Sequence, residues 1–145
     1  MIAIMKKFGV KMKKLSKGAE KIIKLLTKAK INFTIEKTFP DLKSSKGKPL
    51  RFDFAIYNSD WSKFLLLEYD GEAHFQKINH FYKTNKKYEN ALGRDRKKND
   101  YCLARGIQLY RIPYWEIDNI TNVCMLFSNK FLVRSRYHND KLIPK

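Results

Sequence analysis

Three carboxylates in two neighbouring segments could together bind a divalent cation. Asp53 alternates with aromatic or aliphatic residues at positions 52, 54 and 56, which predicts that these three share one face of a strand and Asp53 the other. Glu68 and Asp70, two residues apart, share one face of the next expected strand. Such carboxylates would repel one another in a poorly solvated site, and Mg²⁺ relieves that repulsion because it binds oxygen ligands. The sequence therefore predicts a metal site at Asp53, Glu68 and Asp70; the alternative is that the acids pair with some of the many lysines and arginines.

A histidine close to this acidic strand end could serve as a general base. Gly71 would let the chain turn sharply and bring His74 back towards Asp70. The pKa of histidine lies near neutrality, which suits removal of a proton from an attacking water, and a bound Mg²⁺ would stabilise charge on a phosphodiester oxygen. The alternative for His74 is a structural or exposed residue, and His80 and His138 are expected at the surface.

Asp95 is a further acidic residue with an informative position in the sequence. In the helix expected over residues 91–105, Asp95 shares one side with Ala91, Lys98 and Cys102, which indicates that it faces inward. An inward carboxylate could hold one tautomer of His74, as carboxylates do for catalytic histidines. Equally, Asp95 could interact with the helix dipole or pair with Lys98 or Asn99.

The charge of the chain favours nucleic acid as the partner. Its 31 Lys and Arg against 14 Asp and Glu give a formal net charge of +17, and phosphate neutralisation by such cations drives binding to DNA. Residues 1–15 are expected to form a basic arm, or a loosely held first helix, before a single domain over residues 16–145. A second basic stretch, over residues 77–98, contains cations interleaved with aromatic residues. The aromatic rings could stack on bases, or the stretch could be a solvated face whose aromatic rings belong to the core. The expected DNA-binding residues are Lys77, Lys83, Lys86, Lys87, Arg94, Arg96 and Lys97.

Composition argues against two classes of protein. The longest uninterrupted apolar runs have five residues or fewer, so no membrane-spanning helix or signal peptide is expected, and no membrane partner. Cys102 and Cys124 are the only cysteines, without CxxC spacing or a disulfide framework, which favours a protein of the reducing cytoplasm. Aromatic residues make up 14% of the chain, so a disordered basic tail is excluded.

The order of expected elements predicts an α/β fold. Ser16 is a candidate N-cap for a helix to about residue 30, and residues 31–39, 51–57 and 63–70 have the composition of strands. Pro40 is expected to end the first strand, and the second and third are expected to pair as antiparallel neighbours. The helix over residues 91–105 ends at Gly106, a fourth strand covers residues 107–112, and a last helix is expected over residues 114–131. The class is therefore a mixed sheet of about four strands flanked by helices.

These segments together resemble the PD-(D/E)XK nuclease superfamily, in particular very-short-patch repair endonucleases and EDxHD homing endonucleases of phages and mobile elements. The resemblance covers roughly residues 18–117 and depends on their combination, since each short motif alone is common. It implies a restriction-endonuclease-like core, metal coordination by Asp53 and Glu68, His74 as base, Asp95 as its partner and Glu20 as an outer-shell group. The segments that carry it are a helix with Glu20, Arg51-Phe52-Asp53-Phe54, Leu66-Leu67-Glu68-Tyr69-Asp70-Gly71, and the stretch from Gly93-Arg94-Asp95-Arg96 to Tyr114-Trp115-Glu116.

Two departures from the family pattern shape the expected function. Asp70 stands where the superfamily usually has a lysine, and the repair enzymes' zinc cluster of Cys and His is missing, which favours the phage or mobile-element branch. The resemblance therefore implies a DNA endonuclease that uses Mg²⁺, or alternatively Mn²⁺, and no zinc, and that cuts or nicks by water attack. Its expected location is the cytoplasm of a bacterial host cell. The alternatives are a catalytically inactive nucleic-acid-binding protein and a nuclease selective for junctions or mismatches. A double-strand cut would need two active sites, so a homodimer or a host or phage protein partner is left open.

Overall fold

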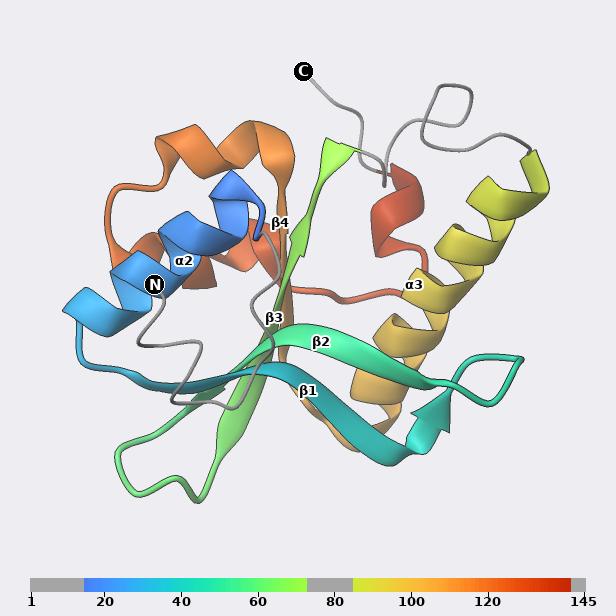
Figure 1. Cartoon of the computed structure of the whole chain (residues 1–145), viewed down its shortest axis with the longest axis horizontal. Coiled ribbons are helices and arrows are strands. Elements are labelled where there is room, and N and C mark those ends of the chain that lie inside the picture. Colours follow the sequence, from blue (N-terminus) through green and yellow to red (C-terminus); the bar gives the residue numbers. More distant parts are fainter. Residues whose placement is uncertain (1–14, 73–84, 142–145) are drawn as a thin grey trace.

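A four-stranded mixed sheet with helices on both faces forms the centre of the protein (Figure 1), which confirms the predicted α/β class. The computed structural model describes residues 15–72 and 85–141. The strands lie in the order β1-β2-β3-β4 across the sheet. Their bounds are β1 Asn32–Lys43, β2 Pro49–Tyr57, β3 Phe64–Asp70 and β4 Leu109–Pro113, and the two longer helices are α2 Lys17–Lys28 and α3 Asn85–Arg105.

The pairing of the strands follows from the lengths of their connections. The first three strands form antiparallel pairs through short turns, as predicted for the second and third. β3 and β4 pair in parallel, with Glu68 aligned to Arg111, and the connection between them contains α3. A parallel pair requires such a crossover. Side chains of α3 reach both strands: Lys98 Nζ lies 3.1 Å from Glu68 of β3, and Asn99 Oδ1 accepts a hydrogen bond from Arg111 of β4.

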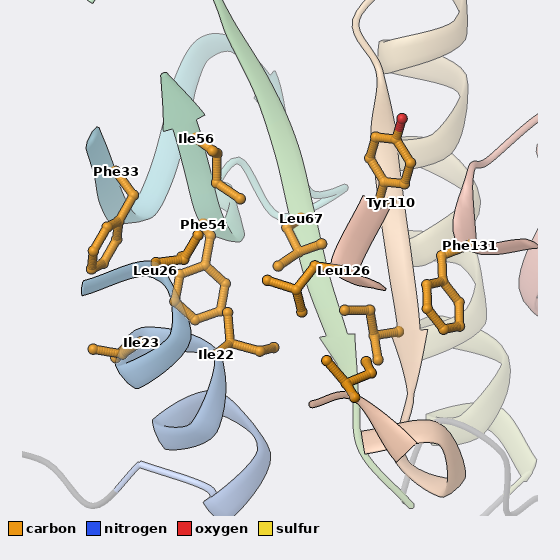
Figure 2. Packing of buried hydrophobic residues seen from close by; sticks show 12 residues of the cluster. Ile22, Ile23, Leu26, Phe33, Phe54, Ile56, Leu67, Tyr110, Leu126 and Phe131 are labelled. Atoms are coloured by element: carbon orange, nitrogen blue, oxygen red, sulfur yellow. The ribbon is translucent and has the colours of Figure 1, made fainter. Parts of the chain in front are cut away.

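Helix α2 covers one face of the sheet. Ser16 caps the helix as predicted, since its Oγ accepts a hydrogen bond from Ala19 N at 3.2 Å. The apolar side of α2 packs on Phe54, Leu67 and other residues of the sheet (Figure 2). Gly18 brings the start of α2 close to the end of β3, because a Cβ at Gly18 would lie 2.3 Å from the ring of Tyr69.

Helix α3 covers the opposite face, over a second core that includes Leu66, Tyr101 and Cys102. Phe52 belongs to this second core, whereas Phe54 packs on the α2 side, so the prediction that both rings share a face is wrong. The regular alternation is interrupted at this level of the sheet. Glu36 of β1, between the pairs of Ile35 with Phe54 and of Lys37 with Phe52, has a φ of 54°, which is outside the strand region.

Several predicted boundaries differ from the structure. Strand β1 continues through the exposed Pro40 to Lys43, because β1 is an edge strand and an edge tolerates the missing N–H. Helix α3 begins at Asn85 instead of residue 91, and Gly106 follows its end with φ 66°. Within residues 15–72 and 85–141, no helix is long and apolar enough to cross a membrane.

The predicted last helix over residues 114–131 is wrong. Three short 3₁₀ helices replace it, η2 Tyr114–Asn119, η3 Val123–Phe127 and η4 Asn129–Phe131. Asn122 begins a new turn, since its side chain accepts a hydrogen bond from Met125 N at 3.2 Å. Asn and Ser side chains compete for backbone groups in this way, which interrupts a continuous helix.

Candidate functional site

Asp53 and Glu68 lie side by side where the β2–β3 ladder ends. The last backbone pair aligns Phe54 with Leu67, and the next two residues are the acids. Here the carboxylates take over the hydrogen bonds of the ladder: Asp53 N donates to Glu68 Oε1 at 2.7 Å, and Tyr69 N donates to Asp53 Oδ2 at 2.8 Å. Each strand therefore fixes the acid of the other, and both carboxylates are held next to each other by backbone groups.

The surroundings of this pair disfavour two negative charges. Glu68 is only 3% exposed, and Asp53 is partly buried. Burial, and after it the charge of Glu68, raises the pKa of Asp53 to about 7, although the hydrogen bond from Tyr69 N and the charge of Lys98 act in the opposite direction. A cation that approached Asp53 and Glu68 would therefore stabilise the ionised form of both carboxylates.

Lys98 of α3 supplies one positive charge at this position. Its Nζ lies 3.1 Å from Glu68 Oε2 and 5.4 Å from the centroid of the Phe52 ring. The side chain is 13% exposed, so the ion pair is largely shielded from solvent. The sequence analysis assigned Lys98 no role at the site. Its position on the inward side of the helix, shared with Asp95 and Cys102, was the available signal.

Arg111 of β4 is the second cation of the cluster, and its side chain is fully buried. Its Nη1 lies 2.8 Å from Asp70 Oδ1 and 3.8 Å from Glu68 Oε2. Although burial lowers the pKa of Arg111, Asp70, Asp95 and Glu68 raise it above its usual range, so the guanidinium stays charged. Arg111 was not among the predicted site residues, but a single cation within the apolar segment of residues 107–112 was a detectable signal.

Helix α3 and the C-terminal segment complete the partners of this arginine. Arg111 Nε donates to Asn99 Oδ1 at 2.8 Å, and Nη2 lies 3.6 Å from Asp95 Oδ1. Asn139, in the 3₁₀ helix η5 (His138–Lys141), donates to Asp70 Oδ2 at 2.8 Å. Asp70 therefore has one oxygen bonded to Arg111 and the other to Asn139.

The predicted metal ligands are thus only partly brought together. Asp53 and Glu68 are neighbours, whereas both oxygens of Asp70 are engaged away from this pair by Arg111 and Asn139. In the part of the chain that the structure describes, no group of three His, Cys, Asp or Glu side chains has an arrangement that could hold a metal ion. A metal at this site would depend on two carboxylates and on water molecules.

Asp95 faces inward, as its helical stripe predicted. It is 6% exposed and pairs with Arg111, which differs from the alternative of a pairing with Lys98 or Asn99. His74, with Lys77 and Lys83, lies outside the described residues. Its expected interaction with Asp95 stays a prediction.

Glu20 lies on the half-buried side of α2, the helix that covers the face of the sheet opposite α3. Within the described ranges, no hydrogen bond or ion pair joins it to Asp53, Glu68 or Asp95. The structure therefore brings together three of the five residues that the resemblance named, Asp53, Glu68 and Asp95, around Arg111 and Lys98. The role of Glu20 stays a prediction, and His74 lies outside the described residues.

The remaining predicted DNA-binding residues differ in their surroundings. Lys86 and Lys87 are exposed in the first turn of α3. Arg94 and Lys97 line a groove of about 770 Å³ between α3 and the β1–β2 turn. Arg96 instead pairs with Asp140, and its guanidinium lies 5.2 Å from the centroid of the Tyr137 ring.

His138 is not the surface residue that the sequence analysis expected. It is half-buried, and its buried Nε2 has no hydrogen-bond partner among residues 15–72 and 85–141. Burial lowers the pKa of His138, and the positive charge of Arg111 lowers it further. Its imidazole is therefore neutral near pH 7 beside the buried cluster.

Comparisons with known proteins do not assign a family to this chain. No protein-family model, curated protein or solved structure matches it. The molecule itself defines an α/β protein whose mixed sheet carries a carboxylate pair, Asp53 and Glu68, beside two buried or nearly buried cations.

Proposed function

We propose that this protein is a metal-dependent DNA endonuclease of the phage or mobile-element type, which hydrolyses phosphodiester bonds with Mg²⁺ or Mn²⁺. The observation that carries the proposal is the convergence of Asp53 and Glu68, each fixed by a backbone N–H of the other strand, in a chain with a net charge of +17. A buried carboxylate pair is a typical ligand set for Mg²⁺, and excess positive charge is typical of proteins that bind DNA.

The charges of the cluster are compatible with one divalent cation. Among the residues that the structure describes, four carboxylates, those of Asp53, Glu68, Asp70 and Asp95, accompany two cations, Lys98 and Arg111. When all are ionised, the cluster has an excess of two negative charges, which is the charge that one Mg²⁺ neutralises. Asp53 and Glu68 would hold the metal, because the oxygens of Asp70 are bonded to Arg111 and Asn139. When bound, such a metal lowers the pKa of a water and stabilises negative charge on a phosphodiester oxygen.

The residues of the chain would position the substrate around this pair. Lys98, 3.1 Å from Glu68, would place an ammonium group beside the phosphate that approaches the carboxylates. Arg111 holds Asp70 and Asp95 on the inner side and keeps this acidic cluster folded. His74 is proposed as the base that accepts a proton from the attacking water, with Asp95 as the residue that orients it.

Cleavage of supercoiled plasmid DNA tests the proposal, with Mg²⁺ and with EDTA. Asp53→Asn and Glu68→Gln should each abolish cleavage while keeping the shape of the side chain, and His74→Ala should lower it strongly. Asp100→Asn is the matched control, because Asp100 lies on the same helix as Lys98 but pairs with Arg136 at the surface. Cleavage that survives Asp53→Asn, or that persists in EDTA, would refute the proposed mechanism.

A catalytically inactive nucleic-acid-binding protein is the second candidate. The observation that favours it is the internal pairing of the acids: Glu68 with Lys98, and Asp70 with Arg111 and Asn139. Binding to DNA that is independent of metal, together with no cleavage of any substrate, would support this candidate. Branched, mismatched and plain duplexes, compared in the same assay, separate a structure-selective nuclease from one that acts on ordinary duplex DNA.

A further inference from the structure

The groove beside the candidate site is lined mainly by positive charge. It lies between the β1–β2 turn and the N-terminal half of α3, and it reaches Asp95 and Lys98 of the site. Of the described side chains, six cationic and two acidic ones line it, together with hydroxyl and amide groups that can also bind phosphate. The cationic residues are Lys46, Lys48, Arg51, Arg94, Lys97 and Lys98.

The β1–β2 turn presents its lysines on a fixed base. Ser44 N donates to the carbonyl of Lys48 at 2.7 Å, and Lys48 N donates to Ser44 Oγ at 3.2 Å. Gly47 has a φ of 79°, and a Cβ built there would meet no atom within 4 Å, so the tip of the turn points into open space. Lys46 and Lys48 are exposed on either side of this glycine. A turn that is already ordered loses less entropy when a ligand binds.

The cations of α3 divide between two environments. Arg94 and Lys97 face the groove, and Lys97 Nζ donates a hydrogen bond to the carbonyl of Lys43 at the end of β1. Arg96, on another side of the helix, is paired with Asp140. Only part of the basic stretch of α3 therefore faces the β1–β2 turn, and that part leads to Lys98 and Glu68.

We infer that this groove binds the sugar–phosphate backbone of one DNA strand, with Lys46, Lys48 and Arg51 on one wall and Arg94 and Lys97 on the other. The inference rests on the proposed function, since it supplies the path by which a phosphodiester reaches Asp53 and Glu68. A volume of about 770 Å³ is that of a small-ligand cleft, so the groove accommodates a short stretch of one strand and not the full width of a duplex. The β1–β2 turn is a contact that the basic stretches of the sequence did not indicate.

Binding of a fluorescent duplex oligonucleotide in EDTA tests this groove apart from catalysis. The double variant Lys46→Ala/Lys48→Ala removes two charges from the turn and keeps Gly47. Lys24→Ala/Lys28→Ala is the matched control, because both lysines are exposed on α2, which covers the other face of the sheet. Since the affected side chains are exposed, thermal unfolding of both variants should match that of the wild type.

We expect the turn variant to bind DNA at least about tenfold more weakly at moderate salt. The slope of log K against log[salt] should become shallower by about 2, because each phosphate contact contributes about 0.9. The α2 control should keep the wild-type slope. An unchanged slope in the turn variant, or equal weakening by both pairs, would overturn the inference. If DNA binding depends on the turn but no cleavage occurs with any metal, the groove is supported and the nuclease proposal is refuted. If cleavage occurs but DNA binding does not depend on the turn, the nuclease proposal is supported and the groove is refuted.

Discussion

Replacing Asp53 with Asn should stabilise the metal-free protein at alkaline pH. Burial and the neighbouring Glu68 raise the pKa of Asp53 from 3.8 to about 7, so the ionised form is disfavoured in the folded state. Asn removes this charge, and its amide oxygen can still accept the hydrogen bond from Tyr69 N that Asp53 Oδ2 accepts at 2.8 Å. The substitution therefore separates the cost of the charge from the geometry that the side chain maintains.

The pH range and the sign follow from linkage between protonation and folding. Between pH 3.8 and about 7, the unfolded chain has lost the Asp53 proton while the folded protein keeps it. The folded state then binds more protons, so wild-type stability falls as the pH rises through this range and is constant above it. A shift of about three units corresponds to at most about 4 kcal/mol, and partial exposure of Asp53 reduces this to about 2–4 kcal/mol at pH 8.

Urea unfolding from pH 4 to pH 8 measures this difference. Asp53→Asn should equal the wild type near pH 4 and exceed it by about 2–4 kcal/mol at pH 8 in EDTA. Added Mg²⁺ should stabilise the wild type and leave the variant unchanged, because a ligand that binds only the folded state raises its stability. Asp60→Asn is a control of opposite sign, since hydrogen bonds from Ser62 lower the pKa of Asp60. A variant that is less stable than the wild type at pH 8, or a difference that does not change with pH, would refute the electrostatic reasoning.

Three further predictions concern the surroundings of the site. Arg111→Met should destabilise the fold by about 3–5 kcal/mol in urea unfolding, because it leaves the buried Asp70 and Asp95 without their cation; a loss below about 1 kcal/mol would contradict this role. Gly18→Ala should destabilise the protein, because the new Cβ would lie 2.3 Å from the ring of Tyr69. Gly93→Ala should instead stabilise α3 by about 0.5–1 kcal/mol, because a Cβ at Gly93 would meet no described atom within 4 Å. In the folded protein at pH 8, a thiol reagent should modify the exposed Cys124 alone, because burial raises the pKa of the Cys102 thiol to about 12. Rapid modification of both thiols before unfolding would contradict this prediction.

Local sequence patterns predicted the elements that depend on local physics. The cap at Ser16, the antiparallel pairing of β2 with β3 and the left-handed Gly106 after α3 all depend on neighbours within a few residues. The inward direction of Asp95 followed from helical periodicity in the same way. The helix predicted over residues 114–131 was wrong because the Asn122 side chain caps a new 3₁₀ turn and the backbone is extended at Ile120 and Ser128.

The partners of the acidic residues could not be predicted, because they come from distant parts of the chain. Arg111 reaches Asp70, 41 residues earlier, only when β4 pairs in parallel with β3, and the register of that pair is a tertiary property. Asn139 reaches the same carboxylate from 69 residues away, from a segment with no periodic pattern. Repulsion among the acidic residues suggested a metal ion, whereas in the fold Lys98 and Arg111 also neutralise part of their negative charge.

The ion pairs around Glu68 give a physical reason for an aspartate at position 70. The parallel partner strand aligns Arg111 with Glu68, so a fully buried cation already lies next to position 70. A second cation there would meet Arg111 in the interior, whereas an aspartate forms a 2.8 Å ion pair with it. The ammonium group near the carboxylate pair comes instead from α3, where Lys98 Nζ lies 3.1 Å from Glu68 Oε2. The positive charge beside Glu68 thus comes from α3 and β4, and Asp70 belongs to the packing of the buried cluster.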